Sequence, residues 1–367
     1  MIALPPRARI LVVALRRLGD VLLTTPLIRS LKQAFPDAAI DALVFAGTEG
    51  ILAGNPDLAG VIAMPPRNPG AGLALARTLW RRYDLAVSTQ SGDRPTLFAW
   101  IAGRASGGPV APRGAMAWLK RSALNYPVVA DDSRHRVEEV LRLARALGIP
   151  AVSELVCPAG APRAGLAPEG DYAVIHAGPM FRYKRWTAAG WRAVAAALAE
   201  RGLAVLATGG PGREDRRYLD EVWARSSPPV RRLDGMLTDG VLTDGILTWA
   251  ELAGLIRAAK VYVGPDTSVT HLAAATGAMT VALYGPTDPR RWGPWPVGRA
   301  GGAWQASGTI QRRGNVWLVQ NPQPCLPCQN EGCDRKIESH SRCLDELSPL
   351  QVLAAVDQAL ASARAAH

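Results

Sequence analysis

The sequence predicts an α/β protein of two domains, each with a parallel sheet flanked by helices. Short apolar runs alternate with helical patterns over residues 8–147 and again over 172–284, which is the order of βαβ units. Residues 150–168 are rich in Pro, Ala and Gly, as expected of a linker. A length of 367 residues suits two cores. We place the domains at 1–160 and 161–348, and a last helix at 349–367.

In the first half, strands are predicted where apolar residues run together, and helices where they repeat at helical spacing. One helix begins at Gly19-Asp20, directly after the first strand, and stops near Phe35-Pro36. A second helix is expected over 133–147, whereas residues 105–130 lose the pattern to Gly, Pro and basic residues. The predicted strands are 8–15, 39–45, 60–64 and 83–89, with a helix start at 47–53.

The second half repeats this alternation. The predicted strands are 172–176, 204–208, 261–263 and 280–284, and the predicted helices are 188–201, one beginning near Glu214, and 249–259. Residues 237–247 contain a near-perfect tandem of Leu-Thr-Asp-Gly. Its period is too short for a solenoid repeat, so we interpret it as a duplication that lengthens a surface loop.

The charge balance favours anionic partners. Lys and Arg number 42 against 31 Asp and Glu, which gives a formal net charge of +11. Nucleic acid, the acidic inner leaflet of a membrane and phosphorylated small molecules all fit this balance. The cations form no dense stripe interleaved with aromatic residues, which argues against nucleic acid.

The apolar runs 10–15 and 271–285 are too short or too interrupted for a signal peptide or a membrane span, so we expect a soluble cytoplasmic protein.

The segment around Asp266 is the strongest candidate site. A buried strand ends at Gly264-Pro265, and Asp266, Thr267 and Ser268 then offer N-cap side chains to an alanine-rich helix that carries His271. Free N–H groups and the positive end of the helix dipole bind anions, and ligands of α/β sheets collect at the carboxyl ends of strands. His271 is either a packing residue or a donor to a phosphate oxygen.

Two other strand ends of the second half bear on the same anion. The loop from His176 to Trp186 holds Arg182, Lys184 and Arg185. It is either a diphosphate site or a solvated loop whose Trp186 packs into the core. Residues 208–214 form a glycine-rich turn without the spacing of a dinucleotide fingerprint or a P-loop. Glu214 either accepts ribose hydroxyls or sits in the first helical turn for dipole reasons.

Asp20 and the cysteines are open to more than one interpretation. Asp20 is either an N-cap or a general base, and Gly19 before it lets a ligand approach the backbone. The cysteine cluster supplies zinc-like ligands, but its second half lacks a tight pair, so we favour reduced structural thiols or a labile disulfide over a metal. The members of this cluster are Cys325, Cys328, Cys333 and Cys343, with His340 nearby.

Together these segments resemble glycosyltransferase family 9, which contains the bacterial lipopolysaccharide heptosyltransferases. The resemblance covers nearly the whole chain and depends on the joint occurrence of the motifs in this order. The motifs are Arg17-Leu-Gly-Asp20-Val with Thr25-Pro26-Leu, Tyr183-Lys184-Arg185-Trp186, Gly264-Pro-Asp266-Thr-Ser-Val-Thr-His271, Leu283-Tyr-Gly-Pro-Thr-Asp288-Pro, and Cys325-x-x-Cys328 with Cys343-Leu.

The resemblance implies a GT-B architecture, in which two Rossmann-like, doubly wound domains face each other across a cleft. The first domain takes mainly the acceptor and the second mainly the nucleotide sugar, and the C-terminal helix packs back toward the first. Asp20 is then the general base, and Lys184 holds the donor phosphates. The other donor-binding residues that we expect are Gly19, His176, Arg182, Arg185, Glu214, Leu247, Asp266, Thr267, Ser268 and His271.

The implied reaction is an inverting, metal-independent transfer of heptose from ADP-heptose to a lipid-linked saccharide of the lipopolysaccharide inner core. No cofactor and no nucleic acid are expected, and the basic surface suits peripheral contact with the acidic inner membrane. Two alternatives stay open on the residues alone. One is a sugar-nucleotide epimerase of similar two-domain fold, and the other is a non-catalytic protein that binds nucleotides or anions.

Overall fold

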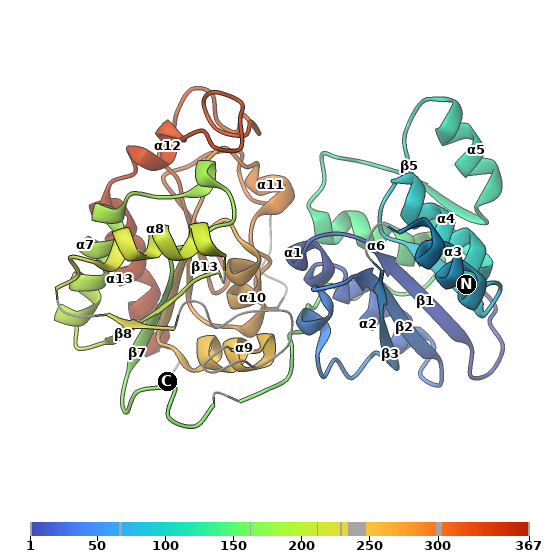
Figure 1. Ribbon diagram of the computed structural model, residues 1–367, viewed down its shortest axis with the longest axis horizontal. Coiled ribbons are helices and arrows are strands. Elements are labelled where there is room, and N and C mark those ends of the chain that lie inside the picture. Colours follow the sequence, from blue (N-terminus) through green and yellow to red (C-terminus); the bar gives the residue numbers. More distant parts are fainter. Residues whose placement is uncertain are drawn as a thin grey trace. The chain divides into compact units, whose positions relative to one another are not determined.

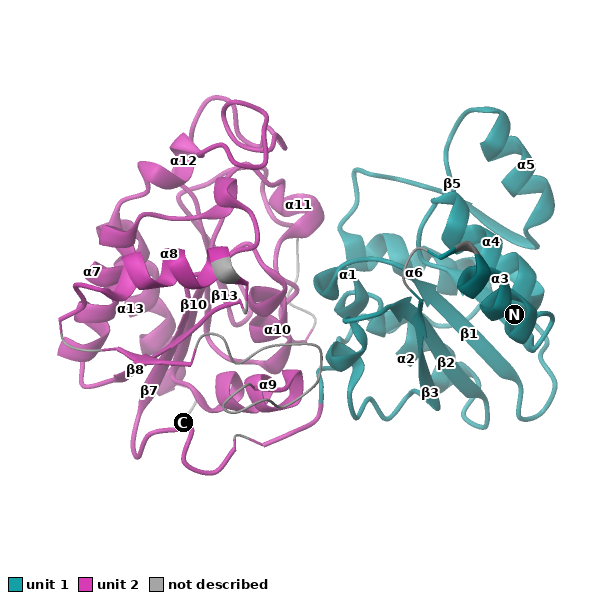
Figure 2. Cartoon of the chain, in the orientation of Figure 1, with its two compact units in different colours: residues 1–158 teal, residues 159–367 magenta. Residues whose placement is uncertain are grey.

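The computed structural model describes residues 2–65, 68–161, 163–210, 212–227, 230–233, 247–298 and 303–365. The chain divides into two compact units, Met1–Pro158 (unit 1) and Ala159–His367 (unit 2) (Figure 2). The division lies within the predicted linker. Most of the tandem at 237–247 lies outside the described residues, so the loop predicted there stays a prediction.

Unit 1 is a parallel sheet with the strand order β3-β2-β1-β4-β5-β6 in its described part. Helices α2 and α6 contact each other over one face, and α3 and α4 contact each other at the other (Figure 1). The strands are β1 Arg9–Ala14, β2 Ala39–Phe45, β3 Gly60–Met64, β4 Tyr83–Ser88, β5 Gly103–Val110 and β6 Tyr126–Val129. The helices are α1 Leu18–Leu22, α2 Thr25–Ala34, η1 Glu49–Leu52, α3 Pro69–Leu79, α4 Asp93–Ala102, α5 Ala115–Ala123 and α6 Arg136–Ala146.

The structure corrects two expectations in unit 1. The single helix predicted from Gly19 is two helices, because Pro26 has no N–H to donate to the Leu22 carbonyl; the Thr25 hydroxyl donates to it instead, at 2.8 Å. The weak region at 105–130 contains the end of β5, α5 and β6. Strand β5 escaped prediction because close packing requires its glycines: a Cβ on Gly103 would lie 2.8 Å from the Ala86 nitrogen.

Unit 2 has the strand order β12-β13-β11-β10-β7-β8-β9 in its described part, parallel except for the β12–β13 pair. That antiparallel pair was not predicted. The strands are β7 Tyr172–His176, β8 Ala204–Thr208, β9 Arg231–Arg232, β10 Val261–Pro265, β11 Thr280–Leu283, β12 Ile310–Arg313 and β13 Val316–Val319. The helices are η2 Arg182–Lys184, α7 Ala188–Glu200, α8 Arg213–Trp223, α9 Trp249–Ala258, α10 Ser268–Thr276, α11 Pro289–Trp292, α12 Arg342–Asp345 and α13 Pro349–Ala365.

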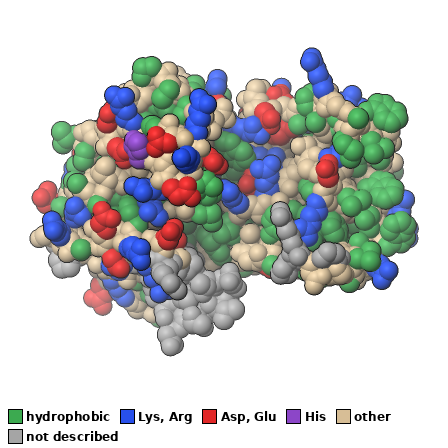
Figure 3. Space-filling model, turned by 45° about the horizontal axis from the view of Figure 1, so that its top comes forward, with side chains coloured by type: hydrophobic (Ala, Val, Ile, Leu, Met, Phe, Trp, Pro, Cys, Tyr) green, Lys and Arg blue, Asp and Glu red, His purple; other side chains and the backbone are tan. Residues whose placement is uncertain are grey.

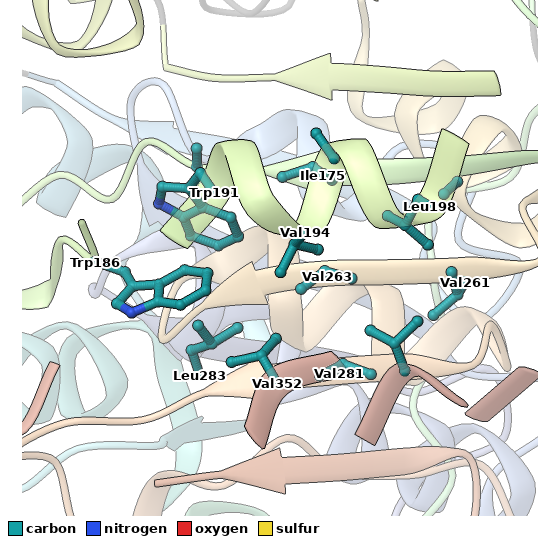
Figure 4. Close-up of a cluster of buried hydrophobic side chains, with 14 of the residues drawn as sticks. Ile175, Trp186, Trp191, Val194, Leu198, Val261, Val263, Val281, Leu283 and Val352 are labelled. Atoms are coloured by element: carbon teal, nitrogen blue, oxygen red, sulfur yellow. The ribbon is translucent and has the colours of Figure 1, made fainter. Parts of the chain in front are cut away.

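The main core of unit 2 lies between the sheet and helices α7, α8 and α13. Trp186 and Trp191 meet edge to face, with ring centroids 5.0 Å apart, beside Val263 and Leu283 (Figure 4). The Trp186 indole donates to the Leu347 carbonyl at 3.0 Å. Helix α13 buries Val352 and neighbouring residues in this core. The helix is therefore part of unit 2, and its return toward the first domain stays a prediction.

Within the described ranges, none of the helices combines the length and the apolar character that crossing a bilayer requires.

Candidate active site

The predicted anion site lies at the point where the strand order of unit 2 reverses. Strands β7 and β10 are parallel neighbours, and the chain runs outward from them in opposite directions. Ligands of open α/β sheets bind at such a switch point. Lys184 follows β7 and Asp266 follows β10, and the Lys184 ammonium donates to the Asp266 carboxylate at 2.5 Å. The fold thus brings together two residues 82 positions apart.

Asp266 also accepts a hydrogen bond from the loop after β11. Thr287 Oγ1 donates at 2.6 Å to Asp266 Oδ2, the oxygen that Lys184 contacts. Only 7% of Asp266 is exposed. Burial by itself raises the pKa of this carboxyl, but the Lys184 ammonium and the Thr287 hydroxyl outweigh it and hold the pKa below its usual value. Asp266 is therefore a buried, ionised anchor for both loops.

Helix α10 begins directly beside this anchor. Of the three residues that the sequence offered as N-caps, Asp266, Thr267 and Ser268, the N-cap is Thr267, whose Oγ1 accepts from the Thr270 N–H at 3.4 Å. Ser268 opens the first turn. His271 is 6% exposed, and its electrostatic interaction with Asp266 adds to the lowering of the Asp266 pKa. The amino end of an α-helix is thus placed next to the Lys184 ammonium, an arrangement suited to an anion.

Two buried tyrosines form hydrogen bonds to the segments that follow β10 and β11. Tyr262 on β10 shares a hydrogen bond of 3.0 Å with Thr270, and Gly264 leaves the space that its hydroxyl occupies, since a Cβ there would lie 2.2 Å from it. Tyr284 donates to the Trp292 carbonyl at 2.8 Å. Burial raises the pKa of both phenols, and for Tyr284 the Asp266 carboxylate adds to the rise. Both are neutral structural residues.

The three cations of the predicted diphosphate loop separate in the structure. Lys184 contacts Asp266, whereas the Arg185 guanidinium lies over the Tyr218 ring, 4.6 Å from its centroid, and 4.0 Å from the Asp215 carboxylate. Arg182 is exposed. Helix α8 thus attracts Arg185 through an aromatic face and a carboxylate, and Lys184 is the member of the three that pairs with Asp266.

The remaining predicted donor residues lie at different depths in unit 2. His176 is 3% exposed, its Nδ1 lies 3.0 Å from Thr208 Oγ1, and burial lowers its pKa to about 4, so the ring is neutral at pH 7. Glu214 is exposed in the first turn of α8. Leu247 is buried, 2% exposed, just before the N-cap of α9. The structure places none of these three in the hydrogen bonds of Asp266.

Asp20 occupies the matching position in unit 1. It follows β1, whose neighbour β4 marks the reversal of strand order in that sheet. Its Oδ1 lies 3.7 Å from Nε of Arg136, and the two side chains are 13% and 9% exposed. Gly19 and Asp20 both lie within α1, whose N-cap is Arg17. Asp20 is therefore not the N-cap, and its buried Oδ1 accepts no hydrogen bond from the described residues.

The cysteine segment connects the loops that form the site. Ser341 Oγ donates to the Tyr183 carbonyl at 2.6 Å, and the Gln329 N–H donates to the Pro286 carbonyl at 2.8 Å. Cys325, Cys328, Cys333 and Cys343 are free thiols. Burial, then the neighbouring thiols, raise the pKa of Cys343 to about 12. In the ranges that the structure describes, no group of three or more His, Cys, Asp or Glu side chains is placed to hold a metal ion.

The sequence did not identify two residues of these sites, Thr287 and Arg136. Thr287 lies in a recognised motif, and the pairing of β10 with β11 carries its loop to the edge where Asp266 lies. That neighbourhood could have been inferred if β11 had been placed beside β10. Arg136 has no local signal, because it is 116 positions from Asp20 and lies in α6, after the last strand of the sheet.

Comparison with known proteins agrees with this geometry. The profile of glycosyltransferase family 9 (heptosyltransferase) matches residues 73–311. Lipopolysaccharide heptosyltransferase 3 of Escherichia coli strain K12 is 30% identical, over 76% of this chain and 82% of that protein. The structure of E. coli ADP-heptose lps heptosyltransferase II superposes with a TM-score of 0.72 at 21% identity, over 97% of this chain and 99% of that one.

A second solved structure, E. coli heptosyltransferase WaaC with ADP, gives a TM-score of 0.67 at 20% identity over 97% of this chain and 99% of that one. These likenesses confirm the predicted GT-B class, with its two Rossmann-like units. The extent of the family match goes beyond fold. The chain is a member of glycosyltransferase family 9, and it is a glycosyltransferase.

Proposed function

We propose that this chain is an inverting heptosyltransferase that transfers heptose from ADP-heptose to a lipid-linked saccharide of the lipopolysaccharide inner core. The observation that carries the proposal is the pairing of Lys184 with Asp266 beside the amino end of α10, in a chain of glycosyltransferase family 9. The names of the relatives supply the sugar and the acceptor class. The WaaC structure with ADP supports the nucleotide.

Unit 2 stabilises the leaving group in this proposal. As the bond between the anomeric carbon and the phosphate oxygen breaks, negative charge develops on the departing ADP. The Lys184 ammonium and the first N–H groups of α10 meet that charge, because fixed donors aimed at a developing charge lower the barrier without reorganisation. These groups supply the stabilisation with no metal ion.

Asp266 positions the cation in this scheme. A carboxylate that faced a diphosphate would repel it, but both contacts of Asp266 Oδ2 point to side chains of the protein, Lys184 and Thr287. The carboxylate therefore holds Lys184 at the strand end and fixes the Thr287 loop beside it. Its removal is expected to weaken donor binding more than proton transfer.

Unit 1 supplies the base. The acceptor hydroxyl oxygen attacks the anomeric carbon, its proton passes to the Asp20 carboxylate, and ADP leaves from the opposite face, so the configuration inverts. Asp20 Oδ1 accepts no hydrogen bond from the described residues and is available for that proton. Arg136 lies beside it, with Nε 3.7 Å from Oδ1, and positions the carboxylate. Gly19 lets a ligand approach the backbone beside Asp20.

The test is a transfer assay with ADP-heptose and heptose-free lipopolysaccharide, followed by mass spectrometry of the acceptor. We expect a mass increase of one heptose per acceptor with release of ADP, unchanged by a chelator. UDP- and GDP-sugars should give little product. Epimerised nucleotide sugar in the absence of acceptor, or no transfer from any donor, would overturn the proposal.

A further inference from the structure

Unit 1 carries an exposed apolar surface on helices α3, α4 and α5, which we call the α3–α5 surface. Its most exposed tryptophans are Trp118, at 69%, and Trp80, at 58%. Exposed large apolar side chains that gather on one part of a protein mark an interaction site, whereas single ones need no explanation. The apolar members of the surface are Leu73, Trp80, Leu97, Trp100, Met116, Trp118 and Leu119.

These side chains are not a poorly buried part of the core. Helices α3 and α4 bury their inward residues, among them Leu79 and Phe98, against the sheet. Helix α5 buries Ala117 alone, and Lys120 fastens it to the start of α4 by donating to the Ser91 carbonyl and pairing with Asp93, both at 2.6 Å. The contacts of α4 with α3 and with Lys120 join the three helices into one surface.

The segment that carries these three helices is strongly basic. Residues 68–123 contain eight Lys and Arg and two Asp, and both carboxylates lie beside cations, Asp93 at Lys120 and Asp84 at 3.9 Å from Arg104. Figure 3 shows hydrophobic and basic side chains together on the unit 1 part of the face in view. The cations are Arg77, Arg81, Arg82, Arg94, Arg104, Arg113, Lys120 and Arg121.

We propose that the α3–α5 surface docks unit 1 on an anionic lipid bilayer. Tryptophan anchors at the level of the headgroups, aliphatic side chains enter the acyl boundary, and arginine binds lipid phosphate. The inference deepens the proposed function, on which it rests, because a lipid-linked acceptor would then be presented to the unit that holds Asp20. In unit 2, the exposed large apolar residues among those described include no tryptophan.

Charge and side-chain type distinguish this occupant from two others. A second copy of the chain would bring the same cations face to face in a two-fold contact, which is repulsive. Single-stranded nucleic acid uses aromatic rings for stacking and has no use for exposed aliphatic side chains, whereas Leu73, Leu97 and Leu119 are half exposed here. A bilayer uses all three kinds of side chain.

The experiment is co-sedimentation of the full chain with vesicles of phosphatidylethanolamine and phosphatidylglycerol, and with vesicles of phosphatidylcholine alone. We expect binding to the anionic vesicles that weakens as salt is raised. Trp80→Ser with Trp118→Ser should lower the partition coefficient at least about tenfold, because two indoles that the bilayer would bury are lost. The matched control is Ile337→Ser with Leu350→Ser, which removes two exposed apolar residues of unit 2.

Three results would overturn the inference: equal partition of wild type and the tryptophan variant, no binding of the wild type to either vesicle, or a tryptophan variant that changes oligomeric state. An unchanged ADP-induced rise in melting temperature shows that the variant is folded. Transfer to a delipidated, soluble acceptor separates the two proposals. The tryptophan variant should keep that transfer, whereas absence of transfer in a wild type that still binds vesicles would contradict the proposed function alone.

Discussion

Units 1 and 2 are built on the same kind of sheet, and each places a carboxylate after the strand at its switch point, but the two carboxylates are held differently. Asp266 in unit 2 accepts from Lys184 and Thr287, and its pKa is low. Asp20 in unit 1 has Arg136 at 3.7 Å and a buried oxygen that accepts no hydrogen bond from the described residues. A saturated carboxylate serves as an anchor, whereas an unsaturated one is able to take a proton.

Removal of the proposed base is expected to have the largest effect. Asp20→Asn should lower the transfer rate about a thousandfold, since positioned general-base catalysis contributes a factor of this order. The melting-temperature rise caused by ADP should not change, because Asp20 belongs to the other unit. Asp37→Asn, an exposed carboxylate of unit 1, is the control and should keep full activity. Retention of transfer by Asp20→Asn would refute the role of Asp20.

The next largest effect is expected in unit 2. Lys184→Met removes the cation from Asp266, so both ADP affinity and transfer rate should fall, the rate by about a hundredfold. Calorimetric titration with ADP and steady-state kinetics measure the two losses. Lys260→Met is the matched control, because Lys260 precedes β10 whereas the site follows it. A variant with normal ADP affinity would show that Lys184 does not contact the donor.

A smaller effect on the transfer rate is expected from substitution of Arg136. Arg136→Met should lower the maximal rate about tenfold by releasing the Asp20 carboxylate, and it should leave ADP affinity unchanged. Arg136→Lys should recover part of the rate, because a cation at this position can still pair with the Asp20 carboxylate. Arg142→Met, on the same helix, is the control. An unchanged maximal rate in Arg136→Met, or no recovery of the rate in Arg136→Lys, would leave Arg136 with a purely structural role.

The smallest effect is expected in the pH dependence of the unfolding free energy. Because the folded pKa of Asp266 is depressed, its contribution is present above the unfolded carboxyl pKa of about 4 and is lost as pH falls through the folded value. The difference in unfolding free energy between wild type and Asp266→Asn should therefore be constant at pH 5–7 and narrow below about pH 4. Urea unfolding at a series of pH values measures it. If this difference in unfolding free energy did not change with pH, Asp266 would not have a depressed pKa in the folded protein.

Much of the fold could be predicted because buried parallel strands are continuous apolar runs. Strands β2, β3, β7 and β8 have the bounds that the sequence predicted. Strand β5 did not, since close packing requires glycine where a strand pattern expects branched residues. The break between α1 and α2 depends on Pro26, which has no backbone N–H to continue the helix. The sequence motif that contains Pro26 does not by itself reveal this break.

The candidate sites were predictable only in part. Lys184 and Asp266 each follow a strand, so their meeting follows from the parallel pairing of β7 with β10. The departure of Arg185 toward α8 does not, because it depends on the Tyr218 ring and the Asp215 carboxylate, which no local pattern connects with that loop. The contact of Arg136 with Asp20 depends in the same way on tertiary packing.

The division of roles between the two units is the central claim, and parallel titration of ADP into wild type, Asp20→Asn and Lys184→Met tests it most directly. We expect Asp20→Asn to bind ADP with wild-type affinity and Lys184→Met to bind at least about tenfold more weakly. Equal losses in the two variants, or no loss in Lys184→Met, would contradict the assignment of leaving-group stabilisation to unit 2.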